Sequence, residues 1–171
     1  MKIIFVIGGA RSGKSAFALN EASKHKGQKA YIATAEALDK EMKERIEKHK
    51  KERGNNWDTY EEAIDIVPLI KKIQGRYNVV LLDCLTLWLS NLMHSNKDVK
   101  SEIEYFCSSL LTIHCSLFTV SNEVGMGIVP DNELARRFRD FAGLLNQKIA
   151  EIADEVYLVT AGIPVKIKHS K

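Results

Sequence analysis

The chain has 171 residues, of which 45% are hydrophobic and 27% charged, values that are ordinary for one globular domain. The formal net charge of +3 at pH 7 is too small to indicate nucleic-acid binding by charge alone. The first apolar run is too short for a signal sequence or a membrane span, so we expect a cytoplasmic protein. The three cysteines, Cys84, Cys107 and Cys115, lack metal-ligand spacing and are expected to be reduced, mostly buried thiols.

A phosphate-binding motif follows directly on the first predicted strand, residues 2–7. It has the pattern G-x-x-x-x-G-K-S and consists of Gly8, Gly9, Ala10, Arg11, Ser12, Gly13, Lys14 and Ser15. Its glycines let successive N–H groups point at phosphate oxygens, and the N-terminus of the following helix adds positive potential. Lys14 is expected to contact the β- and γ-phosphates, and the Ser15 hydroxyl to bind Mg²⁺.

The elements after this motif place a second polar group at the same edge of the sheet. A helix is predicted over 15–24 and a second strand over 30–34. Thr34 then lies at the carboxyl end of its strand, where open α/β sheets bind ligands. A long helix is predicted over 36–53.

The end of this long helix is basic and contains a histidine. His49 continues an apolar row and is surrounded by the cations Arg45, Lys48, Lys50, Lys51 and Arg53. Periodicity leaves two interpretations open. His49 is either a half-buried residue beside a solvated basic face, or a nucleophile or phosphate contact that is brought to a nucleotide.

A predicted strand over 78–83 ends in an acid. Four apolar residues followed by Asp83 are typical of a Walker B strand, whose carboxylate orients Mg²⁺ or its water beside the phosphate loop. Before it, residues 57–62 are predicted as a short strand or turn, and 64–73 as a helix with Pro68 near its start. The strand therefore supplies a second candidate for metal binding.

The second half of the chain continues the alternation of helices and strands. Residues 84–92 favour a helix or an inter-subunit surface, and 95–102 an exposed connection. The strand at 116–120 ends in the polar residues Ser121, Asn122 and Glu123, before a glycine-broken apolar loop over 124–130. The remaining predicted elements are helices over 102–113 and 132–153, a strand over 155–160 and an edge strand over 165–168.

These elements predict one domain, residues 1–171, of the α/β class. We expect a three-layer, P-loop NTPase-type (RecA-like) fold with a mostly parallel sheet and flanking helices. Because carboxyl ends of parallel strands meet at one edge, the phosphate loop, Thr34, Asp83 and residues 121–123 are expected to form one site.

In this order, the motifs resemble those of the bifunctional adenosylcobinamide kinase / adenosylcobinamide-phosphate guanylyltransferase family of cobalamin assembly. The segment Asn122-Glu123-Val124-Gly125-Met126-Gly127-Ile128-Val129-Pro130 is the most specific match. Other matching stretches are the phosphate loop, 31–35, 39–42 with Arg45, Ile46 and His49, 81–86, 134–140, 142–143, 146–147 and 153–156. Asp83 stands where the family often has Glu, which shortens its reach to a metal.

The resemblance implies a role for each candidate. ATP or GTP, with Mg²⁺ at Ser15 and Asp83, would phosphorylate adenosylcobinamide, and His49 would then carry GMP from GTP to adenosylcobinamide phosphate. Lys50 and Arg53 would hold phosphate oxygens, and Thr34 and Glu61 would contact the nucleoside or ribose. The resemblance also implies a homotrimer, for which residues 84–92 and the long helices are candidate contacts.

Two other functions are compatible with the residues. One is a P-loop kinase of another small molecule, in which His49 is structural. The other is a non-catalytic nucleotide-binding regulator that uses residues 124–130 and the helix over 132–153 as a partner surface. Transfer of GMP to His49 distinguishes the predicted enzyme from both.

Overall fold

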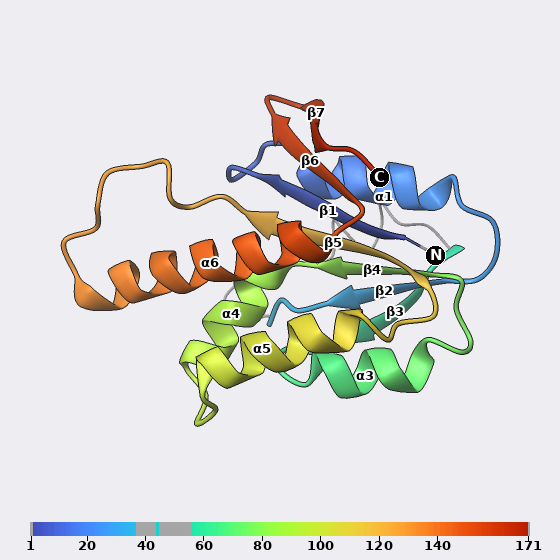
Figure 1. Cartoon of the computed structure of the whole chain (residues 1–171), viewed down its shortest axis with the longest axis horizontal. Helices are drawn as coiled ribbons and strands as arrows, with labels where there is room; N and C mark the ends of the chain where they lie inside the picture. Colours follow the sequence, from blue (N-terminus) through green and yellow to red (C-terminus); the bar gives the residue numbers. More distant parts are fainter. Residues whose placement is uncertain (1, 37–43, 45–55, 171) are drawn as a thin grey trace.

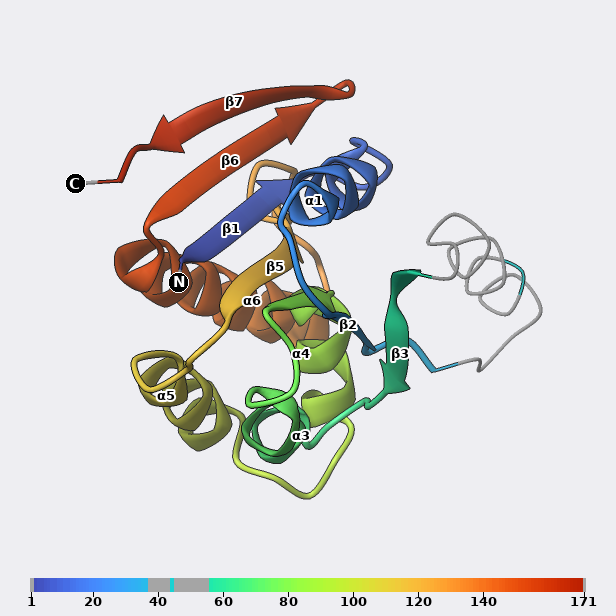
Figure 2. The same ribbon diagram turned by 90° about the vertical axis from the view of Figure 1, so that its right-hand side faces the viewer.

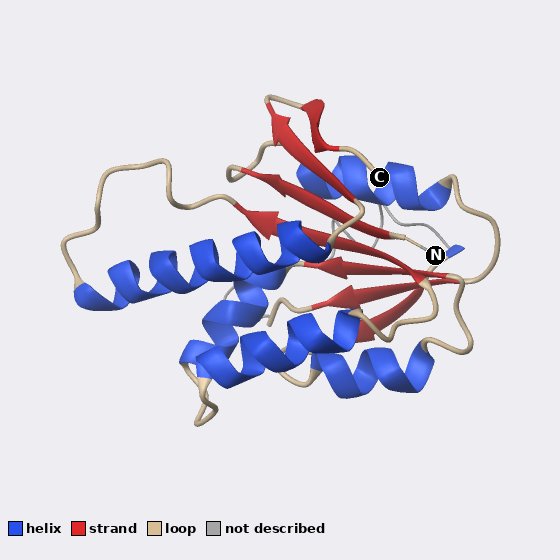
Figure 3. Ribbon diagram, in the orientation of Figure 1, coloured by secondary structure: helices blue, strands red, loops and turns tan. Residues whose placement is uncertain are grey.

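The computed structural model describes residues 2–36, 44 and 56–170. Its strands and helices mostly alternate along the chain, except that α5 follows α4 and β7 follows β6 (Figure 1, Figure 3). In chain order they are β1 (Ile3–Gly8), α1 (Lys14–Ser23), β2 (Lys29–Ala33), β3 (Asp58–Glu61), α3 (Ile66–Ile73), β4 (Val79–Asp83), α4 (Leu85–Met93), α5 (Val99–Leu110), β5 (Ser116–Asn122), α6 (Glu133–Ile152), β6 (Glu155–Thr160) and β7 (Ile163–Lys168).

The described strands form one seven-stranded sheet in the order β3-β2-β4-β5-β1-β6-β7. Every neighbouring pair is parallel except β6 and β7, which are antiparallel. The predicted α/β fold with a mostly parallel sheet is therefore confirmed. β1 lies between β5 and β6, close to the centre of the sheet.

Helices cover both faces of the sheet, which makes three layers (Figure 2). Because side chains of a strand alternate between its faces, β1 directs Ile4 and Val6 to one core and Phe5 and Ile7 to the other. The first core includes Ala18 and Ala22 of α1. The second core is covered by α3, α4, α5 and α6.

This arrangement puts a topological switch point between β1 and β5. The chain leaves the carboxyl end of β1 for α1 on one face, and it leaves the carboxyl end of β5 for α6 on the other. The two connections diverge at neighbouring strands, and such a divergence leaves room for a ligand outside the carboxyl edge. The phosphate loop starts at this point.

Several predicted boundaries differ from those observed, and two of the differences have identifiable local reasons. Helix α5 begins at Val99 rather than near residue 102, because the Asp98 side chain accepts a hydrogen bond from the N–H of Ser101 at 2.7 Å and caps the helix. Strand β7 begins at Ile163 rather than 165, because a two-residue turn lets Ile163 pair with Thr160.

Residues 84–92 are correctly predicted as a helix, but their apolar side chains belong to the core of this chain. Leu85, Trp88, Leu89 and Leu92 are fully buried. The interpretation of this segment as an inter-subunit surface is therefore wrong for its buried side.

The three cysteines are free and buried, as predicted. Among the described helices, none combines the length and apolar character that crossing a membrane requires.

Glu155 connects both ends of the described chain to the last hairpin. Its carboxylate forms ion pairs with Lys2 and Lys166, each at 2.8 Å, and accepts a hydrogen bond from Ser170 at 2.9 Å. The bonds from Lys166 and then Lys2 hold the pKa of Glu155 well below its ordinary value, against the opposing effect of burial. A carboxylate with a depressed folded-state pKa stabilises the fold above its unfolded-state pKa.

We expect Glu155→Gln to lower the free energy of unfolding at pH 7 by on the order of 1–3 kcal/mol, because several hydrogen bonds to a charged group are lost. Denaturant titrations of both proteins at several pH values measure this change in the free energy of unfolding. The difference from wild type should be complete above the unfolded-state pKa of about 4.3 and shrink as the pH falls further. Asp140→Asn, whose partner is the adjacent Arg139, is the control and should change stability by less than about 0.5 kcal/mol. A difference that grows on acidification would contradict this assignment.

Candidate functional site

The phosphate loop curls between the end of β1 and the first turn of α1. The N–H of Ser12 donates to the Gly9 carbonyl at 3.2 Å, and Arg11 and Gly13 have φ values of 56° and 91°. Gly13 is the residue before α1, so the helix opens from a left-handed backbone position that glycine adopts without strain. The N–H groups of the first helical turn have no acceptor within the helix and are the groups that bind phosphate in such loops.

The Lys14 side chain folds back over this loop. Its ammonium donates to the Gly9 carbonyl at 3.0 Å, and the residue is only 8% exposed. A lysine held against the loop in this way keeps its charge beside the position where phosphates would bind. The contact of Lys14 with phosphates is compatible with this placement and stays a prediction.

The loop leaves no space for a side chain at Gly8 and little space at Gly13. A Cβ on Gly8 would overlap the carbonyl oxygen of Val159 and lie 2.7 Å from Ser12 Oγ. A Cβ on Gly13 would lie 3.2 Å from the Cα of Gly162. Ser12 Oγ is buried and has no hydrogen-bond partner among the described residues. Backbone packed this closely, with an unsatisfied hydroxyl inside it, suits a cradle for a ligand rich in acceptor oxygens.

Asp83 ends β4 near the same loop, and its carboxylate is oriented by a tyrosine. Tyr31, which is 5% exposed, donates its hydroxyl to Asp83 Oδ2 at 2.8 Å. Burial, and then the Asp83 charge, raise the pKa of the Cys84 thiol to about 11, while the Lys14 charge opposes the rise. In the parallel sheet β5 lies between β4 and β1, so Asp83 and the start of the phosphate loop lie at the same carboxyl edge.

The oxygens of Ser15 and Asp83 fit the preference of Mg²⁺ for hard ligands. Within the part of the chain that the structure describes, no group of three or more His, Cys, Asp or Glu side chains could hold a metal ion. A cation here would share its coordination with phosphate oxygens and water, as Mg²⁺ commonly does in nucleotide sites. The assignment of Ser15 and Asp83 as metal ligands remains a prediction.

Thr34 joins two strand ends. It is fully buried, and its hydroxyl donates to the Cys84 carbonyl at 2.7 Å and accepts from the Cys84 N–H at 2.8 Å. In this geometry the side chain holds the ends of β2 and β4 together. The predicted contact of Thr34 with a nucleoside remains a prediction, and these two bonds do not supply it.

Glu61 ends the edge strand β3 in the same row of the sheet. In the sheet, Glu61 of β3 pairs with Ala33 of β2, and Ala33 pairs on its other edge with Asp83 of β4. Glu61 is exposed at this carboxyl edge. Its position is compatible with the predicted contact to a nucleoside or ribose, which the structure does not test.

Three side chains from α4 and α6 support the loops at this edge, and the sequence analysis did not identify them. Thr86 Oγ1 accepts from the N–H of Asn122 at 2.6 Å, and Asn146 Nδ2 donates to the carbonyl of Asn122 at 3.2 Å. Asn91 Nδ2 donates to the carbonyls of Thr34 and Ala63 at 2.9 and 3.0 Å. The sequence signal that could have revealed these three side chains is a polar residue within an apolar helical row, because a buried polar group needs a hydrogen-bond partner.

The glycine-broken loop after β5 extends outward from the site. Glu123, the residue before this loop, donates its N–H to the Gly8 carbonyl at 2.9 Å, and its carboxylate accepts from the N–H of Gly125. Beyond it, Met126 and Ile128 are 82% and 97% exposed. The loop therefore begins in contact with the phosphate loop and then presents apolar side chains outside it. His49, Lys50 and Arg53, the remaining predicted site residues, lie outside the described residues.

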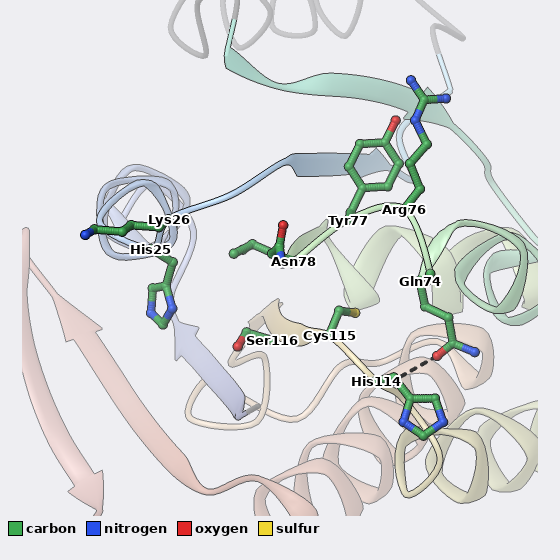
Figure 4. Close-up of a pocket in the computed structure, with 11 residues that line it drawn as sticks. His25, Lys26, Gln74, Arg76, Tyr77, Asn78, His114, Cys115 and Ser116 are labelled. Atoms are coloured by element: carbon green, nitrogen blue, oxygen red, sulfur yellow. Dashed lines mark hydrogen bonds between the residues drawn. The ribbon is translucent and has the colours of Figure 1, made fainter.

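A cavity of about 440 Å³ lies at the opposite edge of the sheet (Figure 4). It is bounded by the amino ends of β4 and β5 and the C-terminal ends of α1 and α3. Its lining consists of His25, Lys26, Gln74, Gly75, Arg76, Tyr77, Asn78, Val79, His114, Cys115 and Ser116. None of the predicted site residues contributes to it, and ligands of open parallel sheets bind at the other edge.

Known proteins resemble this chain over nearly its whole length. Residues 4–167 match the family described as "Cobinamide kinase / cobinamide phosphate guanyltransferase". The bifunctional adenosylcobalamin biosynthesis protein CobU of Escherichia coli (strain K12) is 41% identical over 97% of this chain and 99% of its own. The bifunctional adenosylcobalamin biosynthesis protein CobP of Pseudomonas aeruginosa is 39% identical over 95% of each chain.

Two solved structures share the fold at low sequence identity. The RadB recombinase aligns with a TM-score of 0.54 and 13% identity, over 92% of this chain and 73% of its own. The P4 protein from bacteriophage phi6, in complex with ADP, aligns with a TM-score of 0.53 and 14% identity, over 99% of this chain and 55% of its own. These likenesses confirm the predicted RecA-like, P-loop NTPase-type fold.

We expect Gly8→Ala to lower stability by about 1–3 kcal/mol, because the new methyl group overlaps a backbone oxygen that cannot move without shifting β6. Thermal and denaturant unfolding measure the change. Gly9→Ala is the matched control within the same loop, because a Cβ at Gly9 meets nothing within 4 Å. Equal stability of the two variants would show that the loop is not packed on β6 as described.

Proposed function

Because the chain belongs to the cobinamide kinase / cobinamide phosphate guanyltransferase family, we propose that its phosphate loop serves two successive group transfers in cobalamin biosynthesis. The chain is an enzyme with a nucleotide-binding fold. The observation that carries the proposal is that the phosphate loop and Asp83 share the carboxyl edge of the sheet, in a chain that matches a bifunctional relative over 97% of its length.

The first transfer phosphorylates the corrinoid. The hydroxyl oxygen of the aminopropanol arm of adenosylcobinamide attacks the γ-phosphorus of ATP or GTP. The bond from that phosphorus to the β,γ-bridging oxygen breaks, and the hydroxyl proton passes to water or a base. Lys14 and the loop N–H groups hold the phosphates, so that positioning and charge neutralisation lower the barrier.

Mg²⁺ would neutralise phosphate charge when bound, and Ser15 and Asp83 are the residues that would hold it. Tyr31 would keep the Asp83 carboxylate in place through the 2.8 Å hydrogen bond described above. The shorter reach of Asp83, compared with Glu, suits a contact through a water molecule as well as a direct one.

The second transfer moves GMP. A ring nitrogen of His49 attacks the α-phosphorus of GTP, the bond to the α,β-bridging oxygen breaks, and pyrophosphate leaves. A phosphate oxygen of adenosylcobinamide phosphate then attacks the same phosphorus, the phosphorus–nitrogen bond breaks, and adenosylcobinamide-GDP is formed. Imidazole suits this role better than the neighbouring Lys48, because a phosphoramidate intermediate at neutral pH is better served by a neutral ring nitrogen than by a protonated amine. Lys50 and Arg53 would hold phosphate oxygens, and Glu61 would contact the nucleoside or ribose.

We expect incubation with GTP labelled at the α-phosphate to place label on the protein, in a bond that is labile to acid and stable to alkali. His49→Ala should abolish this label and guanylyl transfer, and it should retain at least part of the kinase activity. His114→Ala is the matched control, because this histidine is exposed at the opposite edge of the sheet.

Each alternative function predicts a different result. A kinase of another small molecule transfers only the γ-phosphate and leaves no label on the protein. A regulator binds nucleotide, but adenosylcobinamide does not stimulate the release of pyrophosphate from GTP. Undiminished labelling of His49→Ala would overturn the assignment of the nucleophile.

A further inference from the structure

The turn between β6 and β7 packs against the phosphate loop, although about 150 residues separate them in the chain. The N–H of Gly162 donates to the carbonyl of Ser12 at 2.8 Å. The close approach of Gly13 to the Cα of Gly162 adds a second contact between the same two segments. The hairpin tip and the loop lie at the same end of the sheet (Figure 2).

The turn has a backbone geometry that few residues adopt. It consists of Ala161 and Gly162, whose φ values are 50° and 80°. Positive φ at both central residues is the type I′ combination, which matches the twist of a two-residue hairpin. Ala161 is strained there, because its Cβ is crowded at positive φ. Gly162 is needed for its φ and not for space, because a Cβ on it would meet nothing within 4 Å.

The hairpin that carries this turn is fixed at several other points. Lys166 of β7 pairs with Glu155 of β6 at 2.8 Å. Lys168 donates to the carbonyls of Ala150 and Glu151 at the end of α6, at 2.8 and 2.7 Å. The turn that contacts the phosphate loop therefore belongs to a hairpin that is held internally by an ion pair and tied to α6 by two hydrogen bonds.

The bond from Gly162 fixes the direction of a whole peptide group in the loop. The Ser12–Gly13 peptide is trans, so its carbonyl and its N–H point in opposite directions. With the Ser12 carbonyl held towards the hairpin, the N–H of Gly13 must point away from the hairpin. In a loop of this kind that N–H belongs to the group that surrounds phosphate.

We infer that Gly162 is a positioning residue for phosphate binding: it orients the Ser12–Gly13 peptide so that the Gly13 N–H faces the nucleotide. This inference rests on the proposed function, because it assigns triphosphates to the loop. Gly162 itself does not touch the substrate, and its effect passes through Ser12 and Gly13.

We expect Gly162→Val to weaken binding of GTP and of inorganic tripolyphosphate by the same factor, on the order of 10-fold, because a β-branched residue disfavours positive φ and displaces the N–H donor. Fluorescent-nucleotide binding and its competition by each compound give the two affinities. Tripolyphosphate has no nucleoside, so an equal loss of affinity for GTP and for tripolyphosphate assigns the effect to phosphate contacts. Gly162→Asn, which tolerates positive φ and keeps the N–H, should bind like wild type.

Gly27→Val is the control for general destabilisation. Gly27 also has a positive φ, 96°, and its Cβ would collide with Asn78 at the opposite edge of the sheet. It should lower the melting temperature without changing either affinity. Gly162→Ala, which is less strained than the valine variant, should show an intermediate loss and keeps the test available if the valine variant fails to fold.

The outcomes separate the two proposals. Failure of the wild-type chain to bind GTP overturns the proposed function together with this inference. Normal binding by the wild type and by Gly162→Val or Gly162→Ala overturns this inference alone. An equal loss of affinity in Gly27→Val also overturns it, because the effect would then follow stability.

Discussion

The site depends on the close packing of three backbone segments at the carboxyl end of β1. The Gly8 carbonyl accepts the N–H of Glu123 from the end of β5, and Gly8 itself lies against the Val159 carbonyl of β6. The Gly162 N–H then holds the Ser12 carbonyl from the hairpin side. These contacts give the phosphate loop one shape, and they are possible because β1 lies between β5 and β6 at the switch point.

This constraint suits the proposal that one loop serves two reactions. A loop held in place on both sides binds the phosphates of a nucleotide in the same way whichever phosphorus is attacked. In the proposed function the nucleophile decides the outcome: a corrinoid hydroxyl would attack the γ-phosphorus, whereas His49 would attack the α-phosphorus. Under this proposal Lys14, Ser15 and Asp83 would serve both steps, and His49 would serve the second step alone.

The fold and the phosphate loop were predictable because their signals are local. A buried strand, glycines at fixed spacing and an acid after an apolar strand each have a physical cause within a few residues of sequence. Contacts of long sequence separation were not predictable in this way. The bond between Gly162 and Ser12, the pair of bonds from Asn91, and the engagement of Thr34 with Cys84 depend on which strands become neighbours. The Asp98 cap is different: its signal is local, and it was missed.

The most direct test of the account is the number of nucleotide sites per chain. Equilibrium titration with non-hydrolysable analogues of ATP and GTP, each in the presence of Mg²⁺, should give one site per chain at which the two compete. Lys14→Ala should weaken both analogues together and reduce both transfers, because both use the same loop. Two independent sites, or a loss of one activity with the other intact in Lys14→Ala, would contradict the central claim that one phosphate loop serves both reactions.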